Sequence, residues 1–250
     1  MKTTNAHTLL TGRLAHWSLT LSLLSLPLFT FAAGNTCEAK SGPLLTPVVE
    51  LYTSEGCSSC PPADRWLSSL KGQSVVAQAF HVAYWDYIGW KDRFAQAAFS
   101  ARQRDVAASS QLRGIYTPQI LRNGRDWQYG RPVSEGAVAA KASIAVHRLG
   151  ATDGFEATVE PMDSKAGWTA YWTVTEDGHS SQVKAGENSG AFLNHDFVVR
   201  QYTAAGRYQG SQTLKFFALA SQPEHPRTIN LVVSDPTSNA TLQAISLPCM

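Results

Sequence analysis

Between Pro47 and about Gly150, short apolar runs alternate with stretches whose apolar residues recur at helical spacing. The apolar runs predict strands over residues 48–52, 75–84, 115–122 and 126–129, the last two flanking Asn123-Gly124, a two-residue hairpin signal. The helical spacing predicts helices over residues 58–71, 91–112 and 134–149, the last with Ser134 as its N-cap. This α/β order, β-α-β-α-β-β-α, predicts a mixed sheet flanked by helices.

Helical spacing ends at the run Gly150-Ala151-Thr152-Asp153-Gly154. Alternating, strand-length apolar runs follow, separated by Gly, Pro, Asn and Asp about every ten residues, over 155–159, 168–175, 197–202, 213–219, 229–233 and 242–247. This pattern is typical of an antiparallel β-sandwich. We therefore expect two domains, a mixed one over residues 44–150 and a smaller β-rich one over residues 151–250.

The first 33 residues have the order of a secretory signal peptide. Lys2 and Arg13 are the only formal charges before the apolar stretch 17–31, which leads into Ala32-Ala33-Gly34. A retained membrane anchor is the alternative, but the apolar stretch is shorter than the roughly 20 residues that a spanning helix needs. We expect a periplasmic or secreted protein with no stable membrane association after cleavage of residues 1–33.

Composition and charge agree with an ordinary globular protein. Hydrophobic residues make up 44% of the chain and charged residues 16%, enough to build ordinary cores. Twenty-one basic and 19 acidic residues give a net charge of +2 without a basic run. The charge therefore gives no reason to expect a nucleic-acid partner.

The strongest chemical signal is the run Gly56-Cys57-Ser58-Ser59-Cys60-Pro61-Pro62-Ala63-Asp64, between a predicted strand and a predicted helix. Prolines are tolerated in the first helical turn, so Pro61-Pro62 places the helix start beside the cysteines. Unpaired N–H groups at a helix start favour a thiolate, which predicts Cys57 as the attacking sulfur and Cys60 as the more buried resolving one. This chemistry is thiol-disulfide exchange with protein or peptide thiols or disulfides and a further redox partner.

The segment 112–124, which contains Thr117-Pro118 and ends in Asn123-Gly124, resembles the thioredoxin superfamily. That resemblance implies a thioredoxin-like mixed sheet and a cis Thr117-Pro118 bond lying against the cysteine pair. The proposed exchange requires that Pro118 lies close to the Cys57 sulfur and that solvent reaches this sulfur. Gly56 stands where that family has an aromatic residue, and Ser58-Ser59 has neither a proline nor a histidine between the cysteines.

A longer signature is similar to a narrower family. It combines the runs 52–64, 84–92 and 186–190 and resembles secreted bacterial proteins grouped as a domain of unknown function with a thioredoxin-like fold. The resemblance covers nearly all of the mature chain. It implies the fold and leaves the substrate open.

Other interpretations of the cysteines remain. Cys57 and Cys60 are also consistent with a permanent structural disulfide in a non-catalytic binding module. A metal site would need more ligands, but only Cys37 and Cys249 remain and no histidine has ligand spacing, so we expect neither metal nor cofactor. Cys37 and Cys249 are the remaining pair, and we expect them to form a structural disulfide that joins the two ends.

Further residues are candidates for support of the site. Tyr84, Trp85 and Trp90 fall in an aromatic-rich connection that would line a peptide groove or form the core of an insertion. His195 with Arg200 is a candidate pair facing the cysteines from the β-rich half. The run 186–190 is interpreted as a tight turn, and His81 as a packed core residue.

Overall fold

The computed structural model describes residues 1, 3, 37–110, 112–134 and 136–249. All helices and strands belong to the unit Asn35–Met250. The predicted signal peptide, residues 1–33, lies outside the described residues apart from Met1 and Thr3. Within the described ranges no helix is long and apolar enough to cross a membrane.

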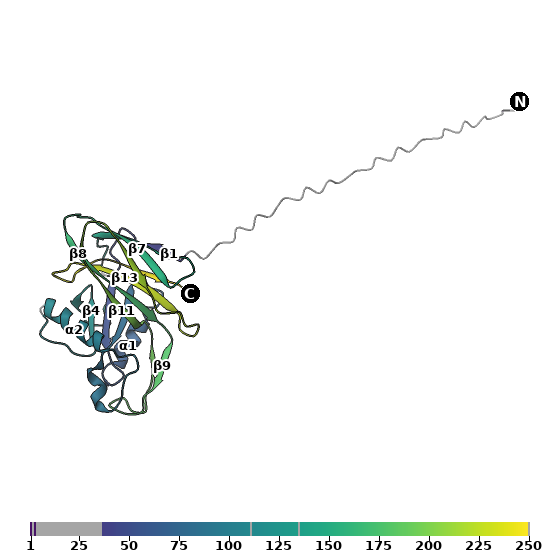
Figure 1. The fold of residues 1–250 in the computed structure, drawn as a ribbon. Helices are drawn as coiled ribbons and strands as arrows, with labels where there is room; N and C mark the ends of the chain where they lie inside the picture. Colours follow the sequence, from purple (N-terminus) through teal and green to yellow (C-terminus); the bar gives the residue numbers. More distant parts are fainter. Residues whose placement is uncertain (2, 4–36, 111, 135, 250) are drawn as a thin grey trace. The chain divides into compact units, whose positions relative to one another are not determined.

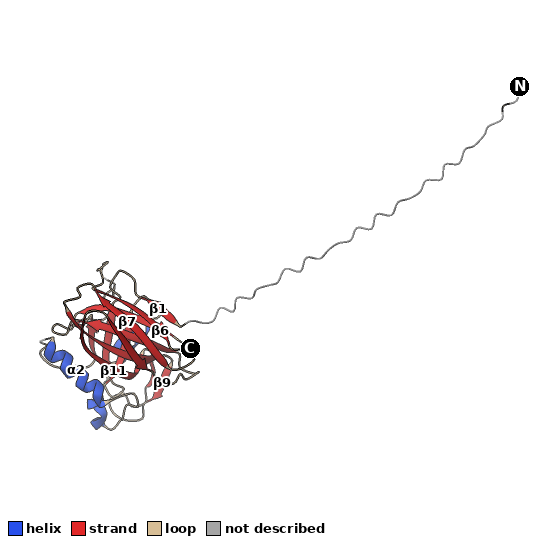
Figure 2. Ribbon diagram, turned by 45° about the horizontal axis from the view of Figure 1, so that its top comes forward, coloured by secondary structure: helices blue, strands red, loops and turns tan. Residues whose placement is uncertain are grey.

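The unit is a mixed α/β structure made mostly of strands, as Figure 2 shows. Two α-helices, α1 (Pro61–Ser68) and α2 (Ala97–Ser109), and one 3₁₀ helix, η1 (Ala83–Ile88), accompany the strands. The strands are β1 (Glu38–Lys40), β2 (Val48–Thr53), β3 (Val76–His81), β4 (Gln119–Arg122), β5 (Arg125–Asp126), β6 (Ala142–Arg148), β7 (Gly154–Pro161), β8 (Gly167–Glu176), β9 (His179–Gln182), β10 (Phe192–His195), β11 (Val198–Gln209), β12 (Gln212–Phe217), β13 (Arg227–Ser234) and β14 (Thr241–Pro248).

One eight-stranded sheet organises the unit, in the order β14-β13-β8-β11-β3-β2-β4-β5. Figure 1 labels four of its strands, β4, β8, β11 and β13. β3 pairs in parallel with β2 and β11, and the other neighbours are antiparallel. A four-stranded sheet, β1-β6-β7-β12, and the β9-β10 hairpin complete the structure. Strands from both sides of residue 150 thus share one sheet, so the predicted domain boundary there does not separate two sheets.

Alternation along the strands sends side chains into separate cores on the two faces of this sheet. Val49 and Leu51 of β2 pack with Leu67 of α1, whereas Tyr52 packs on the opposite face with Phe80. Another core lies between the two sheets and is built around two fully buried tryptophans, Trp168 and Trp172 of β8. Because β2 and β3 pack against cores on both faces, they fix the positions from which the loops after residues 53 and 81 begin.

Two predicted helices differ from the structure. The predicted helix 134–149 is wrong, because residues 142–148 form β6 and pair with both β1 and β7. Ile144 and Val146 are buried at alternate positions there. The alanines around them fit a helix or a strand, so the pairing with neighbouring strands determines that this segment is a strand. The predicted helix 91–112 begins only at Ala97, because the Asp92 carboxylate accepts the backbone N–H of Phe94 and holds a turn.

The Asn123-Gly124 hairpin is confirmed. Both residues have positive φ, 51° and 77°, as a type I′ turn between β4 and β5 requires. A Cβ at Gly124 would also lie 2.2 Å from the carbonyl oxygen of Asn239, so only glycine fits this close approach.

Cys37 and Cys249 form a disulfide with Cα atoms 5.9 Å apart, as predicted. It closes a sequence separation of 212 residues. Replacing both cysteines with alanine should lower the free energy of unfolding by about 2–5 kcal/mol, because the unfolded chain loses its longest crosslink. Urea denaturation measures this loss, and equal midpoints for the variant and the parent protein would contradict it.

Candidate redox site

The Cys57-Cys60 pair lies in the turn between β2 and α1. The two cysteines are disulfide-bonded, with Cα atoms 5.5 Å apart. The backbone N–H of Cys60 donates to the carbonyl of Cys57 at 3.2 Å, and those of Ala63 and Asp64 donate to the carbonyl of Cys60. Helix α1 begins at Pro61, so Cys60 and not Cys57 occupies the N-cap position.

Both cysteines are covered in this structure. Cys57 is 1% exposed and Cys60 is 0% exposed, while Ser58 and Ser59 between them are exposed. The expectation of an accessible Cys57 sulfur is therefore wrong for this conformation. The Ser59 hydroxyl lies 3.4 Å from the Cys57 sulfur and can donate to it. A hydroxyl there would support a Cys57 thiolate in the reduced protein.

The turn between β9 and β10, residues 186–190, is hydrogen-bonded to the cysteine turn, and we name it the capping loop. Asn188 Nδ2 donates to the carbonyl oxygens of Glu55 and Cys57, both at 2.9 Å. The backbone N–H of Ser58 donates to Glu187 Oε2 at 3.0 Å. The turn interpretation of this run is confirmed. Its contact with the cysteines was missed, because the two segments are about 130 residues apart in sequence.

The capping loop contact depends on the ionisation of Glu187. The hydrogen bond from Ser58 lowers the pKa of this exposed carboxyl below its ordinary value of 4.5. A carboxylate with a lowered pKa loses its favourable contact as the pH falls through that pKa. As the pH falls from about 4.5 through this lowered pKa, the rate at which a phosphine reduces the folded protein should therefore rise relative to that of a variant that lacks the carboxylate.

The Glu187→Gln variant is the control for that pH dependence. It should be reduced faster than the parent protein at neutral pH, and the two rates should converge in acid. Parallel pH profiles for the two proteins would contradict a role for this carboxylate.

The Thr117-Pro118 peptide bond is cis, as predicted. β4 pairs with β2 so that Gln119 lies opposite Tyr52, which brings Pro118 to the β2 end that leads to the cysteines. Trp85 links the two segments: its Nε1 donates to the Thr117 hydroxyl at 2.7 Å. A Cβ at Gly56 would lie 3.1 Å from the Trp85 Cβ, so this close approach explains a glycine before the first cysteine.

The aromatic connection supports the site from inside. Tyr84, Trp85 and Trp90 are all half-buried. The indole of Trp90 donates to Glu55 Oε2 at 2.7 Å, so two of these three side chains already use their polar groups within the protein. Tyr87 is the exposed member, at 83%. A substrate groove over these residues stays a prediction.

Five ionisable side chains are buried around the ends of β2, β3 and β10. They are Glu55, Asp64, His81, Asp92 and His195, each at most 8% exposed. His81 Nδ1 lies 2.7 Å from Asp92 Oδ2, and His195 Nε2 lies 3.2 Å from Glu55 Oε1. The backbone N–H of Glu55 donates to Asp92, which ties the two pairs together. Asp64 stands one turn into α1 from Cys60, on the same helix face.

Charge and burial shift the pKa values of this cluster. Burial alone would raise the pKa of Asp92 and lower that of His81, but their mutual attraction reverses both directions. Burial raises the pKa of Asp64, which favours its neutral acid form. The cluster can therefore take up or release protons beside the cysteines. No group of three His, Cys, Asp or Glu side chains among the described residues is arranged to hold a metal ion.

The His81-Asp92 pair predicts a pH-dependent loss of stability. Its contribution is full below the ordinary histidine pKa of 6.5 and disappears as the pH rises through the raised value. On the acid side it disappears as the pH falls from 3.8 through the lowered pKa of Asp92. Asp92→Asn should therefore cost about 3–5 kcal/mol near pH 5–6 and less near pH 9. Urea denaturation at both pH values tests this, with exposed Asp105→Asn as control; equal losses would contradict it.

Two further sequence candidates are placed differently. His195 lies in the buried cluster, 3.2 Å from Glu55, whereas Arg200 pairs with Glu176 at 3.2 Å instead of facing the cysteines. His81 is fully buried, which confirms it as a core residue, although its partner Asp92 was missed. The spacing of His81 and Asp92 in the sequence could not indicate that pair, because their contact depends on how the connection after β3 folds back.

The family described as "Protein of unknown function (DUF1223)" matches residues 48–234. The chain belongs to this family. The match to DUF1223 spans β2 to β13 and includes the cysteine motif, the cis peptide and the capping loop. No curated protein matches the chain.

Two solved structures resemble this DUF1223 chain. The crystal structure of protein AGR_C_4864 from Agrobacterium tumefaciens has a TM-score of 0.61 and 23% identity, covering 83% of this chain and 96% of that one. HBP35 of Porphyromonas gingivalis has a TM-score of 0.52 and 14% identity, covering 83% and 76%. At these identities the likeness concerns the fold alone.

Proposed function

We propose that this DUF1223 protein is an exported, thioredoxin-like thiol-disulfide oxidoreductase whose Cys57-Cys60 pair exchanges disulfides with protein or peptide substrates. The observation that supports it most is the placement of the pair, at the start of α1 and at the same end of β2 as the cis Thr117-Pro118 bond. A strand that ends in a cis proline exposes backbone for pairing with an extended peptide. The two disulfides suit an oxidising compartment outside the cytosol.

The exchange proceeds in two balanced steps. A substrate thiolate attacks the Cys57 sulfur, the Cys57–Cys60 bond breaks, and the Cys60 sulfur leaves with the electron pair and takes a proton. A second substrate thiolate then attacks the substrate sulfur of the mixed disulfide and releases Cys57. The substrate becomes a disulfide, and the protein gains two electrons and two protons. The reverse sequence reduces a substrate disulfide.

The first step requires that the capping loop moves. Both sulfurs are covered, so an incoming thiolate reaches Cys57 only after the contacts of Glu187 and Asn188 are released. Three hydrogen bonds that involve the side chains of Glu187 and Asn188 hold the capping loop on the cysteine turn, and Glu187 is exposed. Such contacts open at modest cost, since each contributes about 0.5–1.5 kcal/mol.

The burial of both cysteines also favours a second candidate. In it, the protein is a non-catalytic binding module on the same scaffold, and Cys57–Cys60 is a structural disulfide. Buried disulfides are poor substrates for exchange because attack requires access to sulfur.

An insulin-reduction assay separates the two candidates. The parent protein should turn over insulin with dithiothreitol, and Cys57→Ser should lose all turnover. A Cys37→Ser, Cys249→Ser double variant is the matched control, because it removes the other disulfide and should keep the activity. Absence of turnover by the parent protein would support the binding module.

A further inference from the structure

A polar cavity lies on the face of the large sheet opposite α1, away from the cysteines. The sheet curls there, so that Val48 and Val76 meet Val232 of β13 and Ala244 of β14. Residues of α2, β8 and β11 line a cavity of about 380 Å³ on this face. This volume lies within the range of small-molecule sites, which favour the mouths of curled sheets.

The floor of the cavity is a buried, neutralised ion pair. Arg102 Nη2 donates to Glu50 Oε1 at 2.5 Å, and Glu50 also accepts the hydroxyls of Tyr52 and Tyr171. The Arg102 guanidinium lies 4.2 Å from the centre of the Tyr171 ring and 5.0 Å from that of Tyr202. Because the charges of Glu50 and Arg102 neutralise one another, the floor carries no net charge that would select a cation or an anion.

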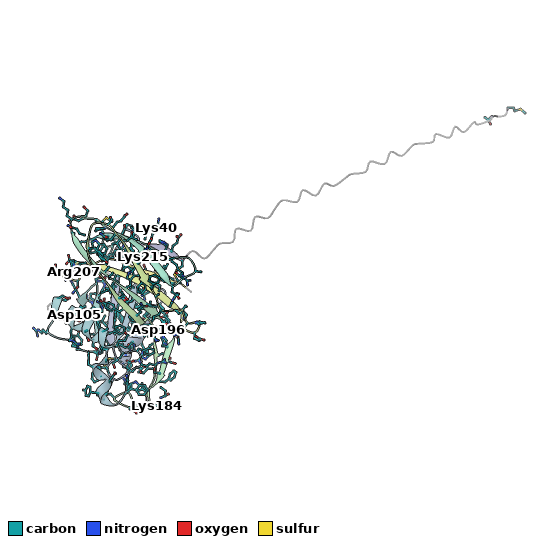
Figure 3. The ribbon with its side chains drawn as sticks, viewed as in Figure 1. Lys40, Asp105, Lys184, Asp196, Arg207 and Lys215 are labelled. Carbon is teal, nitrogen blue, oxygen red and sulfur yellow. A yellow bond between two sulfur atoms is a disulfide. The ribbon has the colours of Figure 1, made fainter. Side chains whose placement is uncertain are left out.

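The rim carries one unpaired charge of each sign. Asp105 of α2 and Arg207 of β11 both line the cavity, and both are exposed. Within the described part of the chain neither side chain has an ion pair, with each other or with any other group. Figure 3 labels both on the same side of the molecule. Val106, Val232 and Tyr202 add apolar and aromatic groups to the lining of the cavity.

We propose that this cavity binds a small zwitterion, a free α-amino acid or a short peptide with free termini. Its carboxylate would lie on Arg207, its ammonium on Asp105, and its side chain against Tyr202 and Val106. A charge-neutral molecule with separated charges complements two opposite charges that do not meet each other, whereas a simple anion or cation is attracted by one and repelled by the other. This site is independent of the cysteine chemistry.

Isothermal titration with three matched probes tests the proposal on the full mature chain. L-phenylalanine carries both charges, N-acetyl-L-phenylalanine only the carboxylate, and L-phenylalaninamide only the ammonium. L-phenylalanine should bind at least about tenfold more tightly than either analogue, since each analogue loses one charge-assisted contact. Arg207→Gln should remove the advantage over the amide alone, and Asp105→Asn the advantage over the N-acetyl form alone.

Lys184→Gln is the control, because Lys184 is exposed and does not line the cavity. It should leave all three affinities unchanged. Both rim variants keep the Glu50-Arg102 pair, so folding is preserved and circular dichroism should match the parent protein. Equal affinities for the three probes, no binding of L-phenylalanine, or identical effects of the two rim variants would each overturn the proposal.

Discussion

Replacing Asn188 with alanine is expected to accelerate the reduction of the Cys57-Cys60 disulfide by dithiothreitol by a factor of about five or more. The variant removes both hydrogen bonds from Asn188 Nδ2 to the backbone around Cys57. At about 0.5–1.5 kcal/mol each, their loss raises the population of the uncapped form by a factor of about 5 to 150. Quenched alkylation of Cys57 during reduction measures the rate.

Asn194→Ala is the matched control for that experiment. Asn194 is exposed on β10, in the same hairpin, and its side chain makes no hydrogen bond within the described structure. It should be reduced at the rate of the parent protein. Equal rates for both variants and the parent protein would show that the capping loop does not limit access to the sulfurs.

Cys60→Ser should accumulate as a mixed disulfide with a peptide disulfide substrate, whereas Cys57→Ser should not. In Cys60→Ser the attacking sulfur remains, but the resolving sulfur one turn on is absent, so the intermediate is not released. Near-complete trapping is expected for the first variant and background labelling for the second. Non-reducing gels and intact mass measure both.

The assignment of Cys57 rests on its position. Cys60 occupies the helix N-cap and begins a buried helical turn with Ala63 and Asp64, whereas the Cys57 carbonyl is bound by Asn188 of the capping loop. Equal trapping through either cysteine would contradict distinct attacking and resolving roles. Combining Cys60→Ser with Asn188→Ala should speed trapping without changing which cysteine is labelled.

Short sequence motifs were sufficient to predict the start of α1, the β4-β5 hairpin and two central strands. Pro61-Pro62 fixed the start of α1, and Asn123-Gly124 fixed the β4-β5 hairpin, because few residue types satisfy those backbone conformations. The strands 48–53 and 76–81 were also found, since continuous apolar runs indicate buried strands.

Tertiary pairing decided the elements that the sequence misassigned. The alanine-rich segment 137–145 fits a helix or a strand, and residues 142–148 form β6 because β1 and β7 pair with them. The division at residue 150 failed to separate two sheets because β11 inserts beside β3, which no local pattern indicates. Long-range pairings of this kind depend on the whole sheet.

The buried surroundings of the cysteines were the largest omission. Glu55 and Asp64 flank the motif, but their burial depends on His195 and His81 from strands far along the chain or across the sheet. A charged residue two positions after a buried strand was the signal available for Glu55. Nothing local indicated that Asn188 of a Gly-flanked turn would cover Cys57.

The reduction potential of the Cys57-Cys60 couple, measured by equilibration with glutathione in the Cys37→Ser, Cys249→Ser background, tests the redox proposal most directly. We expect a value between about −270 and −120 mV, the range of exchanging Cys-x-x-Cys pairs, with the position inside it setting the direction of electron flow. A value below about −300 mV, typical of structural disulfides, would contradict the proposed exchange and leave the pair as a fixed crosslink.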